Sequence, residues 1–365
     1  MSTTVNSPRQ SLLEQARPLL MNWYSQNSRH LPWRQKESSA SLPDPYHVWI
    51  SEIMLQQTRV EAVKDYYLRF LKRLPDVQAL ADVPEDELMK LWQGLGYYSR
   101  ARNLQKTAKI ICGQYHGSFP SECEQLLSLP GIGEYTAGAI ASIAFAKPVP
   151  AVDGNVYRIY TRLFEDDSDI TKTPFQRQIR QELEEIIPHE APGSFNQAWM
   201  DLGATVCLPN GAPLCGKCPL QEKCAANAHS SWQKYPVKPP KKKRQIQERT
   251  VILLEYQGKY LLQKRPPKGL LAGLWEFPAR EGFLNPEGID RLLEQYDISH
   301  GDIELLGTGK HIFSHVEWHM LGYLIHLTKP LKIPPSAESI WITTEKMQRE
   351  YSIPSALRCY YSKLF

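Results

Sequence analysis

The 365-residue sequence lacks any apolar run long enough to span a membrane, which excludes a chain built around transmembrane helices. Its first residues, MSTTVNSPRQ, also lack the basic and then apolar pattern of a secretory signal. We therefore expect a cytoplasmic protein with no membrane partner.

A strong excess of charge of either sign is missing too. The net charge is +4, from 43 basic and 39 acidic residues, but five basic residues belong to the run KPPKKKR at 238–244. The other 38 basic residues are matched by the 39 acidic ones, so net charge does not identify a partner. With 42% hydrophobic and 22% charged residues, the chain falls in the globular range, and its length allows two domains.

Up to about residue 206 the chain lacks clear strand patterns, and apolar residues recur at spacings of three and four. This spacing predicts an all-α region. The clearest helical runs are 11–26, 46–74, 100–115 and 175–187.

The pattern changes after the segment 236–247, which is rich in proline and basic residues and which we interpret as a solvated linker. In 248–265, β-rich runs flank a glycine turn, and 311–328 is a second candidate strand pair. We predict a multi-domain chain with a helical domain at 8–228, a linker at 229–247 and an α+β domain at 248–365.

Four of the seven cysteines fall within 18 residues, with the spacing C-x7-C-x2-C-x5-C. Four thiolates this close suit tetrahedral zinc or a [4Fe–4S] cluster. A zinc ribbon usually has two C-x2-C pairs, whereas this sequence has one, and the asymmetry favours an iron–sulfur cluster. The predicted ligands are Cys207, Cys215, Cys218 and Cys224.

The stretch LPGIGEYTAGAI at 129–140 ends one helical pattern and begins another. Backbone N–H groups in such a turn can point outward together, and Gly131 and Gly133 would let an anion such as a phosphate approach. A plain helix connection with glycine at a C-cap explains the same turn equally well.

Two carboxylates stand out in the helical region. Glu52 has mostly apolar neighbours at helical spacing, which predicts a desolvated carboxyl group with a raised pKa, suited to a general acid. Asp153 lies where an extended segment enters a helix, so it is a candidate N-cap, and the helix N-terminus would keep it ionised. Such a pair can split a glycosidic bond. The alternatives are an exposed glutamate and a purely structural cap.

A glycine hairpin, an aspartate entering the next helix and a four-cysteine loop occur in that order. Over residues 10–228 this arrangement resembles the helix–hairpin–helix DNA glycosylases of the endonuclease III superfamily. The segments LPWR, WISEIMLQQTRV, GLGYYSRARNL, LPGIGEYTAG and AVDGNVYR resemble MutY-type adenine glycosylases in particular.

The resemblance implies removal of adenine paired with 8-oxoguanine or guanine, after the adenine flips out of duplex DNA. It implies that Glu52 protonates adenine N7, that Asp153 stabilises the sugar cation and that Asn155 orients the carboxylates. Residues similar to those of the adenine pocket are Arg29, Leu31, Trp33 and Gln197. Gln57 and Tyr97 resemble residues that enter the base stack near 8-oxoguanine, although plain packing also explains Tyr97 and Leu31.

Tyr135 distinguishes two reaction types within the superfamily. Bifunctional relatives carry a lysine at this place in the hairpin, and its amine forms a Schiff base that leads to strand cleavage. A tyrosine phenol lacks this chemistry. The sequence therefore predicts base removal without efficient strand cleavage.

The sequence departs from the family pattern in two places. The family's usual loop is C-x6-C-x2-C-x5-C, whereas the first gap here has seven residues. An insertion, QKESSASLPD at 35–44, separates LPWR from the helix of Glu52. We expect the loop to keep its [4Fe–4S] cluster by bulging outward at the extra residue.

The second domain resembles a Nudix fold at GLLAGLWEFP, residues 269–278. A Nudix hydrolase needs an R-E-x-x-E-E helix to hold Mg²⁺, and the helical segment 288–298 has one glutamate after its arginine. Hydrolysis is therefore not expected. The resemblance instead assigns the reading of 8-oxoguanine to Phe313, Ser314 and His315, while a plain strand end is the alternative.

Three functions remain open. The first is a monofunctional, monomeric adenine glycosylase acting at the nucleoid, and the second is a bifunctional glycosylase and lyase acting on damaged pyrimidines. The third is a lesion-binding module without chemistry. The missing lysine and the second domain count against the second function, and the carboxylates Glu52 and Asp153 count against the third.

Overall fold

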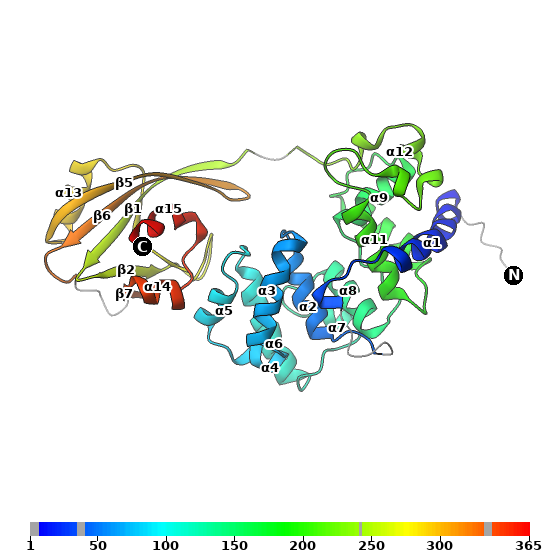
Figure 1. Cartoon of the computed structure of the whole chain (residues 1–365), viewed down its shortest axis with the longest axis horizontal. Coiled ribbons are helices and arrows are strands. Elements are labelled where there is room, and N and C mark those ends of the chain that lie inside the picture. Colours follow the sequence, from blue (N-terminus) through cyan, green and yellow to red (C-terminus); the bar gives the residue numbers. More distant parts are fainter. Residues whose placement is uncertain (1–6, 35–40, 241–242, 332–337) are drawn as a thin grey trace. The chain divides into compact units, whose positions relative to one another are not determined.

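The structure is a computed structural model that describes residues 7–34, 41–240, 243–331 and 338–365. Its contacts divide the chain into two compact units. Unit 1 comprises Met1–Asp82 and Asn103–Pro240, and unit 2 comprises Val83–Arg102 and Lys241–Phe365 (Figure 1). Residues 35–40 of the insertion and 241–242 of the basic run lie outside the described residues.

Unit 1 is helical in its described part, as the apolar spacing predicts. One α-helix, α6 (Ser99–Gln114), contains the boundary between the units. The other α-helices of unit 1 are α1 (Pro8–Asn27), α2 (Pro45–Leu55), α3 (Val60–Arg73), α4 (Val77–Asp82), α7 (Cys123–Leu127), α8 (Glu134–Phe145), α9 (Gly154–Phe164), α10 (Thr173–Glu184), α11 (Pro192–Thr205) and α12 (Ala225–Ala228). Short 3-10 turns lie at Pro32–Arg34, Cys215–Lys217, Gln221–Lys223 and Trp232–Lys234.

The prediction of one continuous helical run over 46–74 is wrong, because the structure has two helices there, α2 and α3. The first, α2, begins where the Asp44 side chain accepts from the backbone N–H of Tyr46, with Pro45 in the first turn. It ends at Leu55, and Gln57 then adopts the left-handed conformation with φ of 62°. A non-glycine residue with this φ cannot continue a right-handed helix, so α3 starts afresh at Val60.

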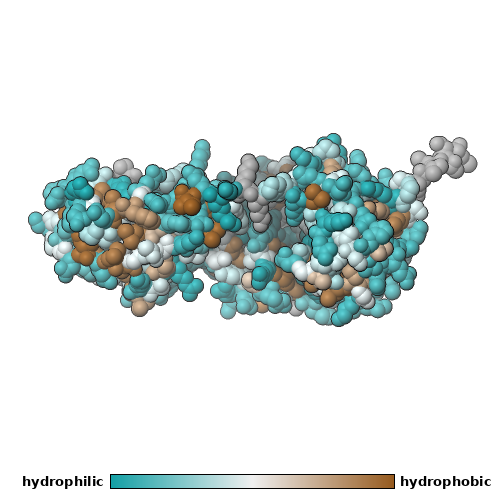
Figure 2. Space-filling model, turned by 90° about the horizontal axis from the view of Figure 1, so that it is seen from above, coloured by the Kyte–Doolittle hydropathy of each residue, from teal (hydrophilic) through white to brown (hydrophobic). Residues whose placement is uncertain are grey.

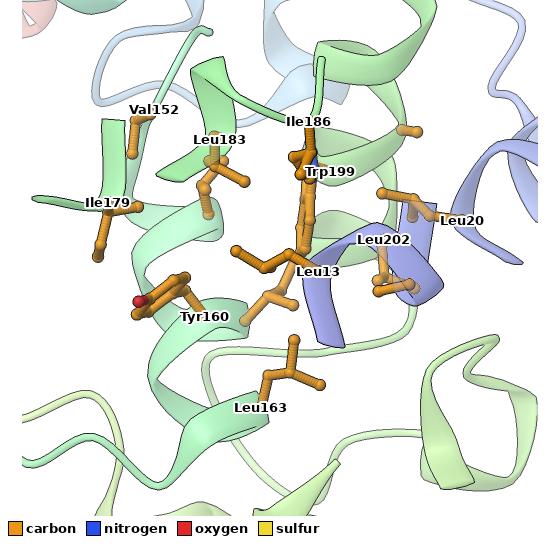
Figure 3. Close-up of a cluster of buried hydrophobic side chains, with 14 of the residues drawn as sticks. Leu13, Leu20, Val152, Tyr160, Leu163, Ile179, Leu183, Ile186, Trp199 and Leu202 are labelled. Atoms are coloured by element: carbon orange, nitrogen blue, oxygen red, sulfur yellow. The ribbon is translucent and has the colours of Figure 1, made fainter. Parts of the chain in front are cut away.

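One hydrophobic cluster of unit 1 lies between α1, α9, α10 and α11. Leu13 and Leu20 of α1 meet Tyr160 of α9 and Trp199 of α11, and all four are fully or almost fully buried (Figure 3). Because α9 and α11 are both fixed by this core, the residues at the start of α9 have a rigid foundation.

Unit 2 contains a mixed sheet with the strand order β3-β2-β1-β6-β5, in which β4 also pairs with β1 and β7 with β2. The pairing of β1 with β6 is parallel, and the other pairings between the described strands are antiparallel. The strands are β1 (Gln245–Tyr256), β2 (Lys259–Lys264), β3 (Trp275–Glu276), β4 (Ala279–Glu281), β5 (His300–Ile312), β6 (Val316–Leu327) and β7 (Ser339–Thr343).

Helices cover both faces of this sheet. Alternate residues of β6 point to opposite faces, so Tyr323 packs with Ile289 of α13 (Pro286–Gln295), whereas Trp318 packs with Met347 of α14 (Thr344–Glu350). The short helix α15 (Arg358–Tyr361) is followed by a 3-10 turn at Ser362–Leu364, and α5 (Glu85–Leu91) also belongs to unit 2. This architecture confirms the predicted fold class, a helical domain followed by an α+β domain.

Two further findings concern the surface and membranes. On the face drawn in Figure 2, hydrophilic residues predominate and hydrophobic residues occur in smaller groups. Among the helices of the described ranges, none combines the length and apolar character that crossing a bilayer requires.

Candidate active site and cysteine pocket

Glu52 and Tyr135 meet in the interior of unit 1. Glu52 lies on α2 and is 6% exposed, and the Tyr135 hydroxyl, in the first turn of α8, donates a hydrogen bond of 2.6 Å to its Oε2. Burial raises the pKa of Glu52 to about 6, while the hydrogen bond from Tyr135 lowers it and the negative charge of Asp153 raises it. The geometry therefore provides a buried carboxyl group that can hold a proton near neutral pH.

Asp153 caps α9 and is surrounded by donors. Its Oδ1 accepts from the backbone N–H groups of Asn155 and Val156, each at 2.9 Å, and its Oδ2 accepts from the Asn155 side chain at 2.7 Å. Burial raises the pKa of Asp153, and these hydrogen bonds oppose the rise. The N-cap predicted from the sequence is confirmed, and Asn155 holds the carboxylate by its side chain.

Arg158 connects this carboxylate to the cysteine loop, a link that the sequence analysis missed. Its Nη2 donates to Asn155 Oδ1 at 2.8 Å and to the Gly203 carbonyl at 2.7 Å, and its Nε donates to the Cys207 carbonyl at 2.9 Å. A Cβ at Gly203 would lie 2.5 Å from the Asn155 Cβ, so only glycine fits there. The spacing of Asn155 and Arg158, three residues apart on one helix, was the available signal.

A second buried group of charges lies near the entry of α2. Asp201 of α11 is fully buried and accepts hydrogen bonds from Arg29 and Arg34, with the shortest distance to each at 2.7 Å. Burial alone would raise the pKa of Asp201, but these bonds hold it below its ordinary value. Arg29 was predicted from the sequence. Arg34, the last residue of LPWR, was not, and its charge also acts on Glu52.

The other predicted pocket residues have mainly packing contacts. Leu31 and Trp33 are buried, and Trp33 meets the ring of Tyr67 edge-on with centroids 5.4 Å apart. Gln197 is half-buried on α11 and donates to the Gly193 carbonyl at 3.2 Å.

The hairpin between α7 and α8 shows why its two glycines differ. Gly131 has φ of 79°, and a Cβ on it would lie 2.7 Å from the Asn103 Cβ, so both backbone and space require glycine. Gly133 is the N-cap of α8, and a Cβ on it would meet nothing within 4 Å. The protein's own packing thus explains Gly131 and leaves Gly133 without a structural requirement.

The four predicted cysteine ligands line one pocket of about 460 Å³ that includes open solvent. Arg162 of α9 also lines it, and its Nη1 lies 3.2 Å from the Cys207 Sγ. In the described ranges, no three His, Cys, Asp or Glu side chains are grouped so as to hold one metal ion. A common pocket bordered by four thiols and a guanidinium can accommodate a negatively charged group.

In unit 2, the predicted lesion-reading residues lie around the turn between β5 and β6. The Phe313 ring packs against Trp318 at 4.9 Å and His311 at 4.6 Å, whereas Ser314 and His315 are exposed. The Ser314 hydroxyl lies 2.6 Å from the Tyr97 hydroxyl. Phe313 is therefore partly buried by packing, and Ser314 and His315 are the accessible members of the group.

Both residues that resemble stack-entering side chains, Gln57 and Tyr97, are left-handed, with φ of 62° and 46°. Non-glycine residues rarely adopt this conformation, and it occurs often at functional sites. The sequence gives no sign of this conformation.

Both domains are similar in sequence to known proteins. Residues 50–189 match the family described as HhH-GPD superfamily base excision DNA repair protein, and residues 249–363 match the NUDIX domain. An adenine DNA glycosylase of Buchnera aphidicola is 37% identical over 85% of this chain and 87% of its own length. The adenine DNA glycosylase of Mus musculus is 36% identical over 90% of this chain and 73% of its own.

Solved structures of DNA glycosylases resemble the helical part. A thermostable thymine-DNA glycosylase aligns with a TM-score of 0.53 and 26% identity, over 60% of this chain and 97% of its own. Endonuclease III in a non-covalent complex with DNA aligns with a TM-score of 0.50 and 26% identity, over the same 60% and 97%.

Proposed function

Since this chain belongs to the adenine DNA glycosylase family, we propose that it removes adenine opposite 8-oxoguanine or guanine without cutting the strand. Membership makes it a base excision repair enzyme that acts on DNA, with a helical HhH-GPD domain and a Nudix-like domain. The opposite base and the absence of lyase chemistry are the parts proposed.

The contact between Tyr135 and Glu52 is the observation that carries this proposal. Tyr135 occupies the hairpin position from which an amine would attack the sugar, and its hydroxyl is bonded to the candidate acid. A neutral phenol cannot form a Schiff base, so the hairpin supplies no covalent route to strand cleavage. The bifunctional alternative is not favoured.

We propose that the two carboxylates divide the reaction between them. Glu52, protonated, donates to adenine N7, and the N9–C1′ bond breaks with its electrons passing to the base. Asp153, held by Asn155 and the α9 N-terminus, faces the sugar cation as an anion. Water then adds to C1′ and passes a proton to the Glu52 carboxylate, which restores the acid, and the phosphodiester bonds of the strand stay intact.

For DNA binding, we propose that the backbone N–H groups at Gly131 and Gly133 receive a phosphate. The room around Gly133 supports this, because the protein itself leaves that space open. We propose that Gln57, Tyr97, Phe313, Ser314 and His315 act on the strand that carries 8-oxoguanine. Arg29, Leu31, Trp33 and Gln197 are the proposed adenine-pocket residues.

Cys207, Cys215, Cys218 and Cys224 are the proposed ligands of a [4Fe–4S] cluster. The residues fit it, because four thiols border one pocket and Arg162 lies against the first of them. When bound, the cluster would cross-link the loop and fix the carbonyl that accepts from Arg158. We further propose a monomer that works at the nucleoid in the cytoplasm.

A single-turnover assay on a duplex with one A:8-oxoguanine pair, end-labelled on the adenine strand, tests the proposal. Each sample is divided, and half is treated with hot alkali. We expect cleavage only after alkali, and none with Glu52→Gln in either half. Cleavage without alkali would contradict the assignment of Tyr135, and no cleavage in either half with wild type would contradict adenine removal.

A further inference from the structure

The turn before α6 holds an unusual backbone conformation. Gly94, Gly96 and Tyr97 all have positive φ, at 106°, 68° and 46°. For tyrosine this left-handed conformation is strained. Arg100, which is 9% exposed, is one of the residues that hold it, donating through Nη2 to the carbonyls of Leu95 at 2.8 Å and Gly96 at 3.1 Å.

This turn is fastened to the chain segment that follows α14. Lys90 Nζ donates to the Tyr351 carbonyl, and Gln93 Nε2 donates to the Ile353 carbonyl, each at 3.0 Å. Between them, the Ser352 hydroxyl, which is 2% exposed, lies 3.4 Å from the Tyr98 hydroxyl. The three consecutive residues Tyr351–Ile353 thus contact the end of α5 and the turn that follows it.

At the other end of the turn, Tyr97 points outward. Its side chain is 51% exposed, and its hydroxyl meets Ser314 at 2.6 Å. The neighbouring residues therefore differ: Tyr98 is 7% exposed and anchors the turn, whereas Tyr97 presents its ring. All of these contacts lie within unit 2.

We propose that Lys90 and Gln93, with their acceptors in Tyr351–Ile353, are positioning residues that determine specificity for the base opposite adenine. They hold the turn so that Tyr97 and Ser314 face the lesion strand together. This inference rests on the proposed function, because it assumes that these two side chains read the opposite base.

The physical reason is the small tolerance of such recognition. The Tyr97 ring must enter a base stack while its hydroxyl stays near Ser314. A shift of about 1 Å would break both contacts, and misplacement of that size can lower a rate about 100-fold. Without the two donors, the strained turn can relax and Tyr97 can leave the left-handed region. The discrimination would fall, while Glu52 and Asp153, which belong to unit 1, would keep their contacts.

The test uses the full chain with Lys90→Met and Gln93→Leu combined. Lys259→Met, an exposed lysine of β2 in the same unit, is the matched control. Single-turnover rate constants are measured on A:8-oxoguanine and on A:G duplexes at saturating protein. We expect their ratio to fall about tenfold in the double variant, as lost hydrogen bonds of this strength predict, and to stay unchanged in the control.

Repeating the measurement in a Tyr97→Ala background shows whether Lys90 and Gln93 act through Tyr97. If it does, the two substitutions produce no further fall there. An unchanged ratio in the wild-type background, or an additive fall in the Tyr97→Ala background, would overturn the inference. If the double variant does not fold, each single substitution provides the same test with a smaller change.

Failure of the proposed function has a different signature. In that case the wild-type protein itself would show no adenine removal, or no preference for 8-oxoguanine over guanine. If wild type shows the preference and the double variant keeps it, only the inference about Lys90 and Gln93 is wrong.

Discussion

The surroundings of Glu52 and Asp153 differ although both carboxylates lie in unit 1. Glu52 lies on an apolar helix face and accepts from the Tyr135 hydroxyl. Asp153 accepts three hydrogen bonds at a helix N-terminus and is tied through Asn155 to Arg158. Burial raises the pKa of each carboxyl group, and Asp153 accepts three hydrogen bonds that oppose the rise whereas Glu52 accepts one from Tyr135.

The largest expected effect is the loss of the acid. Glu52→Gln keeps the shape of the side chain but has no proton of suitable acidity, so we expect the rate of adenine removal to fall by about 10³-fold or more. Single-turnover kinetics on an A:8-oxoguanine duplex measures this, and a binding assay on the same duplex controls for affinity. A wild-type rate would show that Glu52 is not the acid.

We expect a smaller effect when the hydrogen bonds that hold Asn155 beside Asp153 are removed. Arg158→Met removes the hydrogen bonds to Asn155, Gly203 and the Cys207 carbonyl, so Asn155 can turn away from Asp153. We expect the rate to fall by about 10- to 100-fold, with Arg158→Lys intermediate. Iron and sulfide content measured on the same samples separates this effect from loss of the proposed cluster. An unaffected rate at full iron content would mean that Asp153 needs no such support.

Protein stability provides a third comparison. The folded-state pKa of Glu52 is raised to about 6 from an ordinary 4.5, so its ionisation destabilises the fold as the pH rises through this range. At pH 7.5 the cost is about 2 kcal/mol, and Glu52→Gln removes it. We expect the variant to gain thermal stability over wild type at pH 7.5 and little at pH 5. The same difference at both pH values would contradict a raised pKa.

The smallest effect concerns pH dependence. If protonated Glu52 is required, the rate falls as the pH rises above about 6. Tyr135→Phe removes a hydrogen bond that lowers this pKa, so the descending limb should move to higher pH by about one unit. A pH–rate profile of both proteins measures the shift. Movement to lower pH would mean that Tyr135 favours the protonated acid.

Part of the difference between the surroundings of Glu52 and Asp153 could be predicted from the sequence. Apolar spacing around Glu52 and the entry of a helix after Asp153 are local patterns, and burial and capping follow from local geometry. The contacts of Arg34 with Asp201 and of Arg158 with Cys207 join residues 49 or more positions apart. No period or spacing in one sequence specifies such pairs, although the position of Arg158 on α9 was a clue.

The fold shows the same limit. The helical runs were predicted, but the break after Leu55 was not, because the residues of QQTR suit a helix as well as a turn. The glycine turn of β1 and β2 was predicted from its residues, whereas the parallel pairing of β1 with β6 was not. Alternation in a strand shows which residues share a face, and it does not identify the neighbouring strand.

The close approach of α9 and α11 at Gly203 has a consequence for heredity. One added methyl group there would lie 2.5 Å from the Asn155 Cβ and would turn that side chain or part the helices. Under the proposed function, adenine would then stay opposite oxidised guanine through the next replication. A cell with such an allele would still make the protein, and its descendants would record the defect as guanine positions replaced by thymine.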